Sequence, residues 1–409
     1  MKKILTMILS LCLSIQAEAQ IDSLVIEPLP WPQNLQARID TILMTPLLET
    51  TQLGLMVYDL TADSTLYTYG HRQRLRPAST MKLLTAIAAL DRLGSDYQLK
   101  TSLCYQGVID GGTLFGDLVC VGGMDPMFDR RDMHSFVNKV RHQGIDTIRG
   151  QIVADLSFRD DDRLGEGWCW DDDNPVLTPL LYDGKDCFTE QLIRELRRDG
   201  VVIIDTVSIQ RPSMKTSKKS LGPAPSTLHQ IAVRSHSVGE LLIQMLKESD
   251  NLYAESLFMQ LAGSVGSKPA TGKQAASQVR RLIQKAGLMP GDYRVADGSG
   301  LSLYNYVSAE LEVCLLRYAF VHRGIYDALL PSLPIAAVDG TLKSRMTKSP
   351  AAGNVKAKTG TVSGISSLAG YCTAPNGHYL AFSMINQGVS RMSDGRNLQD
   401  LLCVAMCSE

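Results

Sequence analysis

The feature that most constrains this chain is the run Leu83–Leu90, in which Thr85 is the one polar residue. A helix that is apolar on almost every side has no face suited to water, so it must be buried at the centre of a domain. Pro77-Ala78-Ser79 is typical of a helix start, and Gly94 of a helix end. The run therefore predicts a layered domain built around one central helix. Lys82 would lie at the start of that helix, among apolar neighbours.

The segments around this helix predict an α/β domain interrupted by an insertion. Gln52–Leu60 and Ser64–Tyr69 alternate apolar and polar residues, as paired strands do. Residues 98–210 differ, with short β-like segments and two amphipathic helices near 131–143 and 188–199. The later elements are helices at Val238–Lys247, Asn251–Leu261 and Ala275–Ala286, strands at Gly353–Lys358, Ser366–Tyr371 and His378–Ile385, and a helix at Asn397–Met406. We expect one domain over 20–97 and 228–409, with an inserted region at 98–227.

The first 19 residues have the features of a cleaved secretory signal. Lys2-Lys3 precedes an apolar run, Ile4–Ile15, and Ala17-Glu18-Ala19 offers small residues at both recognition positions of a signal peptidase. The run is shorter than the roughly 20 residues needed to cross a bilayer. We therefore expect an exported, periplasmic protein that starts near Gln20, with no transmembrane anchor after cleavage.

The net charge argues against a nucleic-acid-binding protein, and the cysteines allow expectations about their positions. Lys+Arg 41 against Asp+Glu 42 gives a net charge of −1, without the basic excess of nucleic-acid binders. The Lys-rich stretch Arg211–Thr227 is expected to be a solvated connector. Cys104 and Cys120 flank the turn signal Asp110-Gly111-Gly112, so we expect them to face each other across two strands. Cys403 and Cys407 should share a helix face. An exported protein permits disulfides, but their pairing stays open.

Three short patterns carry the chemistry: Ser79-Thr80-Met81-Lys82, Ser249-Asp250-Asn251 and Lys358-Thr359-Gly360. Residues three apart on a helix lie on one face, so Ser79 and Lys82 should be neighbours. Taken alone, the first pattern is equally typical of an exposed helical pair. That alternative fits poorly here, because a lysine among apolar residues needs polar partners. The three patterns together are typical of serine β-lactamases and penicillin-binding proteins.

In this chemistry Ser79 is the nucleophile, and Lys82 can accept its proton only as a neutral amine. The reference pKa of lysine, near 10.4, must then fall by about three units. Burial beside the apolar helix would lower the pKa, and a second cation, Lys358, would lower it further. The helix N-terminus also presents the backbone N–H of Ser79 to a developing oxyanion.

The other two patterns have ordinary alternatives of their own. Ser249, Asp250 and Asn251 lie in a break between helices, where Ser, Asp and Asn are all good N-caps. Beside Ser79, the Ser249 hydroxyl would relay a proton to the leaving amine, and Asn251 would donate to a substrate carbonyl. Lys358-Thr359 ends an alternating strand and would bind a carboxylate, whereas a solvated lysine is the alternative. Gly360 would permit close approach of the substrate to the backbone.

The order of these motifs resembles class C penicillin-binding proteins, the D-alanyl-D-alanine carboxypeptidase/endopeptidase family, from about Thr51 to Gly388. The matching blocks are Pro77–Lys82, Gly122-Gly123-Met124-Asp125-Pro126, Trp168-Cys169-Trp170-Asp171-Asp172, Ser249–Glu255, Asp297-Gly298-Ser299-Gly300-Leu301-Ser302, Val338-Asp339-Gly340-Thr341-Leu342 and Lys356–Thr361. The resemblance implies a penicillin-binding, serine β-lactamase-like catalytic domain, split by a large insert forming two smaller, mainly β domains.

The resemblance also implies roles for particular residues. Ser79 would be acylated with loss of D-Ala, Lys82 would be the base, and the N–H groups of Ser79 and Thr361 would form the oxyanion hole. Asp172, with Asp171 as a weaker alternative, would reach from the insert to the amino group of the substrate's diamino acid. Leu303 is a departure, because the family usually has Arg there. Ser363 is a second departure, since some relatives have Gln.

The sequence thus predicts a serine D-alanyl-D-alanine carboxypeptidase that acts on peptidoglycan stem peptides and is inhibited covalently by β-lactams. D,D-endopeptidase activity on crosslinks is a further expectation. A β-lactamase-like esterase and a catalytically silent wall-binding protein are the alternatives. No cofactor or metal is expected, because the chain has no Cys-x-x-Cys pair and none of its seven His lies in a recognisable motif. The oligomeric state is left open.

Overall fold

The computed structural model describes residues 29–204, 208–211, 227–266 and 269–409. The helices are α2 (Gln33–Leu43), α3 (Leu47–Thr50), α4 (Met81–Arg92), α5 (Arg130–His142), α6 (Phe188–Arg198), α7 (Val238–Lys247), α8 (Asn251–Gly263), α9 (Gly272–Lys285), α10 (Ala309–Val321), α11 (Arg323–Leu329) and α12 (Met392–Cys407). Short 3₁₀ turns include η1 (Ala78–Thr80), η2 (Pro290–Asp292), η3 (Leu330–Ser332) and η4 (Gly340–Leu342). The predicted signal peptide and most of the predicted connector lie outside the described residues.

The strands are β1 (Gln52–Asp59), β2 (Ser64–Tyr69), β3 (Gln98–Asp110), β4 (Thr113–Val121), β5 (Thr147–Arg149), β6 (Ile152–Asp155), β7 (Val202–Ile204), β8 (Ser208–Arg211), β9 (His229–Ser237), β10 (Lys356–Val362), β11 (Gly364–Thr373) and β12 (Tyr379–Val389). They form two sheets. The first has the order β10-β11-β12-β1-β2, so the two ends of the described chain pair within it.

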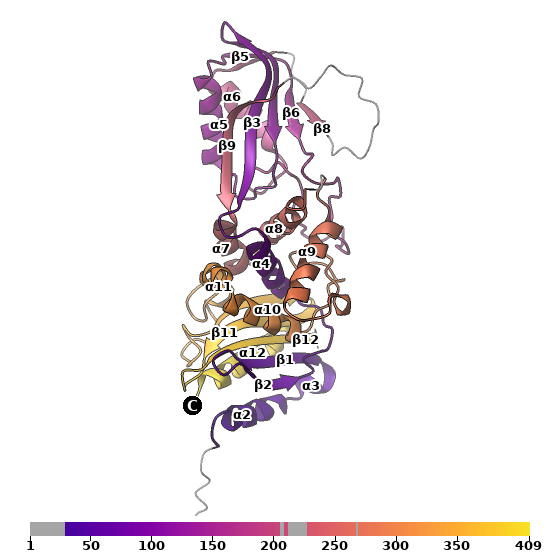
Figure 1. The fold of residues 1–409 in the computed structure, drawn as a ribbon, viewed down its shortest axis with the longest axis vertical. Helices are drawn as coiled ribbons and strands as arrows, with labels where there is room; N and C mark the ends of the chain where they lie inside the picture. Colours follow the sequence, from indigo (N-terminus) through magenta and orange to yellow (C-terminus); the bar gives the residue numbers. More distant parts are fainter. Residues whose placement is uncertain (1–28, 205–207, 212–226, 267–268) are drawn as a thin grey trace, which may run out of the picture.

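The first sheet is covered on both faces, and the alternation in β1 shows how. Leu53, Leu55 and Val57 belong to the core on the side of α2 and α12, whereas Met56 belongs to the core on the other side. Figure 1 shows α10 and α4 on that second side. The predicted strand pair β1–β2 is confirmed, since the two strands pair antiparallel.

Helix α4 is the centre of the larger core, as the sequence predicts. Every residue from Met81 to Leu90 is buried. Its neighbours are α7, α8, α9, α10 and α11, all of which contribute to the same core. The predicted central helix is therefore confirmed, and its amino-terminal end is the fixed point on which the site is built.

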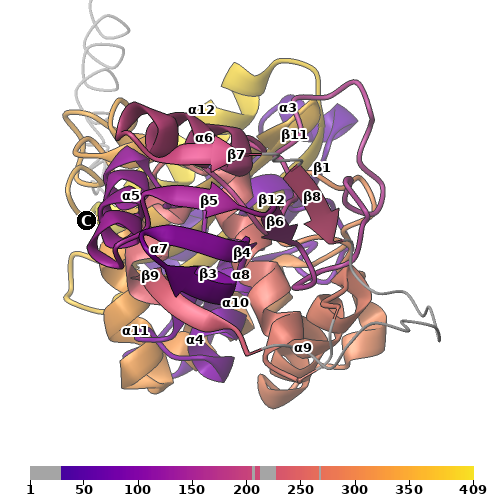
Figure 2. The same ribbon diagram turned by 90° about the horizontal axis from the view of Figure 1, so that it is seen from above.

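The inserted region has a sheet of its own, in the order β7-β5-β4-β3-β9, with β6 beside β4 and β8 beside β6. Figure 2 shows α5 and α6 on the same side of this sheet. Phe128, Phe136 and Phe188 pack together between these helices and the strands. Strand β9 pairs with β3 and leads directly into α7, so the second sheet extends past the expected boundary at 228. The two sheets lie at opposite ends of an elongated molecule (Figure 1).

The structure corrects the prediction that Cys104 and Cys120 face each other. Gly111 and Gly112 form a two-residue turn, so Asp110 pairs with Thr113. In that register Cys104 lies opposite Val119 and Cys120 opposite Leu103. Because side chains alternate between the faces of a sheet, the two thiols point to opposite sides.

Apart from the exposed Cys169, the cysteines of the described residues are buried or part-buried. The eight cysteines of the described residues are free: Cys104, Cys120, Cys169, Cys187, Cys314, Cys372, Cys403 and Cys407. Cys403 and Cys407 share the buried face of α12, as predicted, and pack with Cys372 of β11. Across the described ranges, no three His, Cys, Asp or Glu side chains are grouped so as to hold a metal ion.

Helix α2 precedes the first element that the sequence predicts. It forms because Leu35 and Ile39 lie one turn apart and bury one face against α12. One local prediction differs from the structure. Lys358-Thr359-Gly360 lies inside β10 rather than at the end of a strand. Strand β10 is at the edge of its sheet, where glycine is tolerated. Of the helices in the described part, none is long and apolar enough to cross a bilayer.

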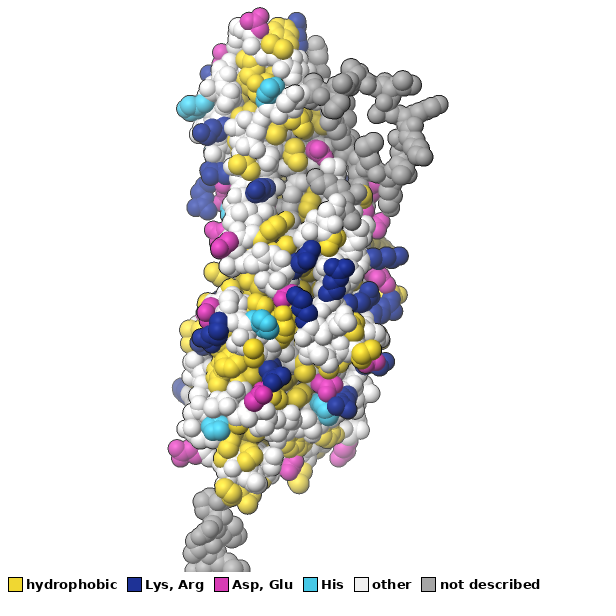
Figure 3. Space-filling model, in the orientation of Figure 1, with side chains coloured by type: hydrophobic (Ala, Val, Ile, Leu, Met, Phe, Trp, Pro, Cys, Tyr) yellow, Lys and Arg dark blue, Asp and Glu magenta, His cyan; other side chains and the backbone are white. Residues whose placement is uncertain are grey.

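Several Lys and Arg side chains gather near mid-height on the face that Figure 3 shows, and others are scattered over the rest of that face together with acidic and apolar side chains. Helix α9 carries Lys273, Arg280, Arg281 and Lys285. The basic stretch that the sequence indicated, 211–227, lies mostly outside the described residues.

Candidate active site

Ser79 is the middle residue of η1, which leads directly into α4, and it is part-buried at the edge of the first sheet. The residue before it, Ala78, has a φ of 50°, a conformation that side chains other than glycine rarely adopt. The turn is held by Thr80, whose hydroxyl donates to the carbonyl of Pro77 at 2.8 Å. Strained backbone of this kind clusters at functional sites.

Lys82 is fully buried one turn further along, and its amine has three oxygen partners. Nζ lies 3.0 Å from Ser79 Oγ, 2.7 Å from Asn251 Oδ1 and 2.8 Å from the carbonyl oxygen of Ser299. The predicted contact between Ser79 and Lys82 is present. The expectation that a lysine here needs polar partners is met as well.

The types of these partners decide what the amine can do. The oxygens of Asn251 and Ser299 can only accept hydrogen bonds, whereas a hydroxyl can donate or accept. A neutral amine has two N–H groups and one lone pair. With both N–H groups given to Asn251 and Ser299, the lone pair is left for the O–H of Ser79. The geometry thus suits proton transfer from Ser79 to Lys82.

Burial lowers the pKa of Lys82 to about 8. The negative charges of Asp297, Glu255 and Asp250 act in the opposite direction and raise it. A lysine with this pKa is neutral in about one molecule in ten at pH 7, far more often than an ordinary lysine, which allows it to act as a general base. The sequence predicted the burial, but it did not predict the opposing carboxylates.

The segment between α7 and α8 brings Ser249 and Asn251 to the same place. Ser249 has a φ of 62°, a second strained residue. The cap of α8 is Asp250, whose Oδ1 accepts from the backbone N–H of Leu252 at 2.9 Å. Because Asp250 is the cap, the alternative that Ser249 or Asn251 serves only as a cap is excluded, and both side chains are left for Lys358 and Lys82.

Lys358 is also fully buried, which excludes the alternative of a solvated lysine. Its Nζ donates to Ser249 Oγ at 2.8 Å and to the carbonyl of Thr359 at 2.7 Å. Burial, with the nearby charge of Lys82, lowers the pKa of Lys358 well below its usual range. The sequence predicted the reverse effect, a lowering of the pKa of Lys82 by Lys358; the structure shows Lys82 lowering the pKa of Lys358, while burial lowers that of Lys82. Thr359 Oγ1 donates to Thr341 Oγ1 at 2.8 Å, which anchors η4 beside β10.

Gly360 lets β10 lie directly against the backbone of η1. A Cβ at this position would lie 2.1 Å from Ser367 Oγ, 2.7 Å from the carbonyl of Pro77 and 3.0 Å from the backbone nitrogen of Ser79. No side chain fits in that space. Thr361 follows and is exposed, so Ser79 and Thr361 lie on two backbones that are in contact.

Three residues that support the site were not predicted as such. Asp297 accepts from the N–H groups of Gly300 at 2.8 Å and Ser302 at 2.6 Å. Glu255 accepts from Ser299 N at 2.8 Å. The indole of Trp168 donates to Asp297 Oδ2 at 2.8 Å. All three lie within the motif blocks that carry the family resemblance, which was the signal available for finding them.

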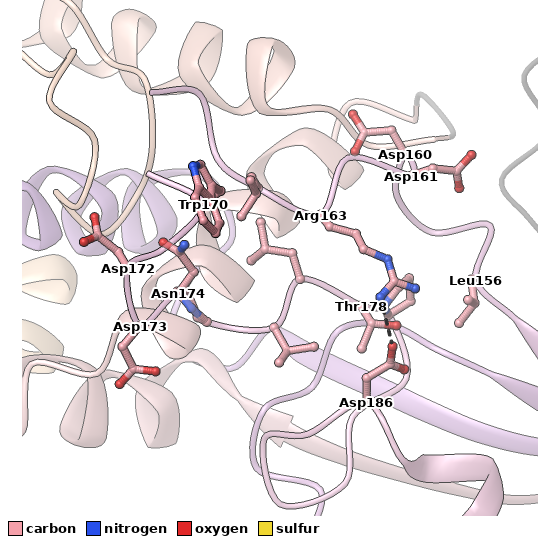
Figure 4. Close-up of a pocket in the computed structure, with 15 residues that line it drawn as sticks. Leu156, Asp160, Asp161, Arg163, Trp170, Asp172, Asp173, Asn174, Thr178 and Asp186 are labelled. Atoms are coloured by element: carbon pink, nitrogen blue, oxygen red, sulfur yellow. Dashed lines mark ion pairs between the residues drawn. The ribbon is translucent and has the colours of Figure 1, made fainter. Parts of the chain in front are cut away.

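Asp172 lies apart from these residues, exposed on the loop between β6 and α6. It lines a cavity of about 540 Å³ together with Trp170, Asp173 and the pair Arg163–Asp186, whose charged atoms are 3.8 Å apart. In Figure 4 the carboxylate of Asp172 points away from that pair. Among the described residues, no hydrogen bond joins the Asp172 side chain to Ser79 or Lys82, so its role stays a prediction. Asp171, Leu303 and Ser363 are also exposed.

The chain is similar to known proteins both in sequence and in structure. The model of the D-Ala-D-Ala carboxypeptidase 3 (S13) family matches residues 35–182 and 176–406. D-alanyl-D-alanine carboxypeptidase DacB of Haemophilus influenzae is 27% identical over 415 residues, which covers 84% of this chain and 86% of the relative. The crystal structure of penicillin binding protein 4 (dacB) from Haemophilus influenzae superposes with a TM-score of 0.78 at 24% identity, covering 90% of this chain and 99% of that one.

A second structure of that protein, complexed with a β-lactam, has a TM-score of 0.73 at 25% identity, with coverage of 90% and 99%. The penicillin-binding, β-lactamase-like fold and the family predicted from the motifs are confirmed. The chain belongs to the D-Ala-D-Ala carboxypeptidase 3 (S13) family and is a serine D-alanyl-D-alanine carboxypeptidase.

Proposed function

We propose that this carboxypeptidase works through an acyl-enzyme on Ser79, with Lys82 as the general base. The observation that carries the proposal is the placing of Lys82 Nζ, 3.0 Å from Ser79 Oγ with two acceptor-only oxygens on its other sides. The Ser79 hydroxyl gives its proton to the Lys82 amine while Oγ bonds to the carbonyl carbon of the scissile D-Ala-D-Ala peptide. The carbonyl oxygen becomes an oxyanion. It lies between the N–H groups of Ser79 and Thr361, which stabilise its charge.

Collapse of this intermediate breaks the bond from the carbonyl carbon to nitrogen. The departing amine of D-Ala takes up the proton that Lys82 received from Ser79, relayed through the Ser249 hydroxyl, which lies 2.8 Å from Lys358 Nζ. Lys82 is then neutral again. Water attacks the ester on Ser79 and gives one proton to Lys82. The bond from Oγ to the carbonyl carbon breaks, Ser79 Oγ takes that proton back from Lys82, and the shortened stem peptide leaves. Two easier steps replace one difficult one.

Substrate binding is assigned to β10, α8 and the insert. Lys358 and Thr359 bind the terminal carboxylate of the stem peptide, and Gly360 keeps β10 in contact with the backbone of Ser79. Asn251 donates through its amide nitrogen to a substrate carbonyl while its oxygen faces Lys82. Asp172 contacts the amino group of the diamino acid, with opposite charges as the basis of recognition.

The same site accounts for β-lactam inhibition and for action on crosslinks. A β-lactam carries a strained amide and a carboxylate, so it acylates Ser79 with the same contacts as the substrate. The β-lactam complex of the Haemophilus protein supports this assignment. D,D-endopeptidase activity requires the same bond cleavage with a longer leaving group. Export through the predicted signal to the periplasm places the enzyme with its peptidoglycan substrate.

The proposal is tested with a fluorescent penicillin and with defined stem peptides. Wild-type protein is expected to form a long-lived adduct and to release D-Ala from a pentapeptide, whereas Ser79→Ala protein does neither. Ser363→Ala, at an exposed serine near the same strand, is the matched control and should label normally. Labelling that persists in Ser79→Ala protein would refute the nucleophile. Rapid turnover of penicillin without a lasting adduct would point instead to a β-lactamase. Monomeric and crosslinked muropeptides separate carboxypeptidase from endopeptidase activity.

A further inference from the structure

Glu255 is a buried carboxylate, 3% exposed, for which the proposed mechanism has no use. It lies on α8 four residues after Asn251, so the two side chains share one face of the helix. Asn251 contacts the amine of Lys82 directly. Glu255, one turn further along, contacts the loop that carries the other oxygen partner of that amine.

That contact is made to the backbone. Oε1 of Glu255 accepts from the N–H of Gly298 at 3.0 Å and from the N–H of Ser299 at 2.8 Å. On the other side, Thr85 of α4 donates to the carbonyl of Gly298 at 2.7 Å. Two consecutive peptide groups are thus held from opposite sides. The carbonyl of Ser299, 2.8 Å from Lys82 Nζ, belongs to the next peptide group of the same loop, whose N–H on Gly300 donates to Asp297 at 2.8 Å.

The negative charge of Glu255 also affects the pKa of the Lys82 amine. Burial, with the neighbouring Asp297, raises the pKa of Glu255 to about 8, against the lowering effect of its hydrogen bonds to Ser299 and Gly298. Glu255 in turn raises the pKa of Lys82. Asp297 acts on Glu255 directly, and Glu255, Asp297 and Asp250 all act on Lys82 of α4. The charged residues that line the same cavity as Glu255 are Arg159, Asp160, Asp162 and Glu166 of the insert, Asp297, and Lys273 of α9.

A cavity of about 490 Å³ reaches Glu255 from the insert side. Its lining includes Glu255 and Asp297 but neither Ser79 nor Lys82. Exposed residues such as Asp162 and Lys273 also line it, so it is open to solvent. The protonation of Glu255 can therefore follow the pH of the solution without passing through the substrate site.

We propose that Glu255 is a positioning residue for Lys82: its carboxylate holds the loop whose Ser299 carbonyl contacts the amine, and its charge adjusts how readily the amine gives up a proton. The inference rests on the role of Lys82 in the proposed function. It assigns Glu255 no contact with substrate. Its effect is transmitted through the backbone of Gly298 and Ser299 and through the field of a buried charge.

The experiment measures the rate constant for penicillin acylation as a function of pH in wild-type, Glu255→Gln and Glu255→Ala proteins. Glu190→Gln, at an exposed position on α6, is the control. The alanine variant loses both backbone contacts, so acylation is expected to fall about 100-fold. The glutamine variant keeps an acceptor oxygen and is expected to stay within about tenfold of wild type above the acid limb of the profile.

The sharper readout is the acid limb of the pH profile, which is the range where the acylation rate constant falls as the pH is lowered. Where Glu255 is ionised, near and above pH 8, its negative charge opposes the loss of a proton from Lys82, so the upper part of the limb should lie at lower pH in Glu255→Gln protein. A limb at the wild-type pH would overturn the inference, as would wild-type acylation by Glu255→Ala protein. If the alanine variant does not fold, the glutamine variant carries the test alone. Absence of acylation in wild-type protein would refute the proposed function instead.

Discussion

The indole N–H of Trp168, from the inserted region, donates to Oδ2 of Asp297 at 2.8 Å. Asp297 holds the loop whose Ser299 carbonyl contacts Lys82. A residue of the insert is therefore connected to the proposed base through one buried carboxylate. Ser302 strengthens this connection, since its hydroxyl donates to the carbonyl of Glu166 at 2.6 Å.

Replacing Trp168 by Phe should weaken catalysis although the position lies outside the catalytic domain. Phenylalanine keeps most of the packing but leaves Asp297 without one donor, and a hydrogen bond to a charged group contributes about 1.5–3 kcal/mol. We expect a lower melting temperature and a fall in the acylation rate of about tenfold. Trp31→Phe, the same change at a site that packs with α2 and α12, is the control. An unchanged acylation rate would show that the insert does not influence the site.

Gly360→Ala should abolish acylation through sterics alone. The new Cβ would meet Ser367 Oγ at 2.1 Å and the backbone of Pro77 at 2.7 Å, so β10 must move away from Ser79. A displacement of this size near reacting atoms lowers rates by about 100-fold or more. Gly324→Ala has open space around its Cβ and serves as the control. Normal penicillin labelling of Gly360→Ala protein would contradict the contact between β10 and η1.

Ser249 should show a conflict between stability and activity. Its φ of 62° is strained for any residue with a side chain, by about 1–2 kcal/mol. Ser249→Gly and Ser249→Ala both lose the hydroxyl that contacts Lys358, so both should acylate slowly. The glycine variant should nevertheless unfold at higher denaturant concentration than the alanine variant. Equal midpoints for the two variants would indicate that the backbone strain is absent in solution.

Asp172→Asn tests the assignment of the insert to substrate recognition. Loss of the negative charge should raise KM about tenfold for a stem peptide with a free diamino-acid amine, with little effect on a peptide whose amine is acetylated. Asp171→Asn, at the neighbouring exposed position, should leave both KM values near wild type. Equal loss on both peptides would mean that the variant disturbs the loop rather than the recognition of charge.

The parts of the fold that depend on the pattern of apolar and polar residues could be predicted from the sequence. The apolar run that starts at Leu83 required a buried helix, and the alternation of Leu53, Leu55 and Val57 required a two-faced strand. The contact between Ser79 and Lys82 followed from helical spacing. Helix α2 was not predicted, because its short apolar stripe becomes informative only when α12 from the other end of the chain covers it.

Backbone atoms account for most of what the sequence could not predict about the site. The carbonyl of Ser299 and the N–H groups that Glu255 accepts exist in every peptide unit, so no residue type marks them. The register of the β3–β4 hairpin is a similar case. Moving the turn by one residue decides whether Cys104 and Cys120 face each other, and the sequence contains two adjacent glycines that can form it.

The most direct test of the account is the rate constant for acylation by penicillin of Lys82→Arg protein, compared with wild type. Arginine keeps a positive charge and hydrogen-bond donors near Ser79, but it does not lose its proton in proteins. If Lys82 acts as a neutral base, the rate should fall by about 10²–10⁴-fold, the range that general bases contribute. A Lys82→Arg protein that folds normally and acylates within about threefold of wild type would contradict the central claim, because a permanent cation would then suffice.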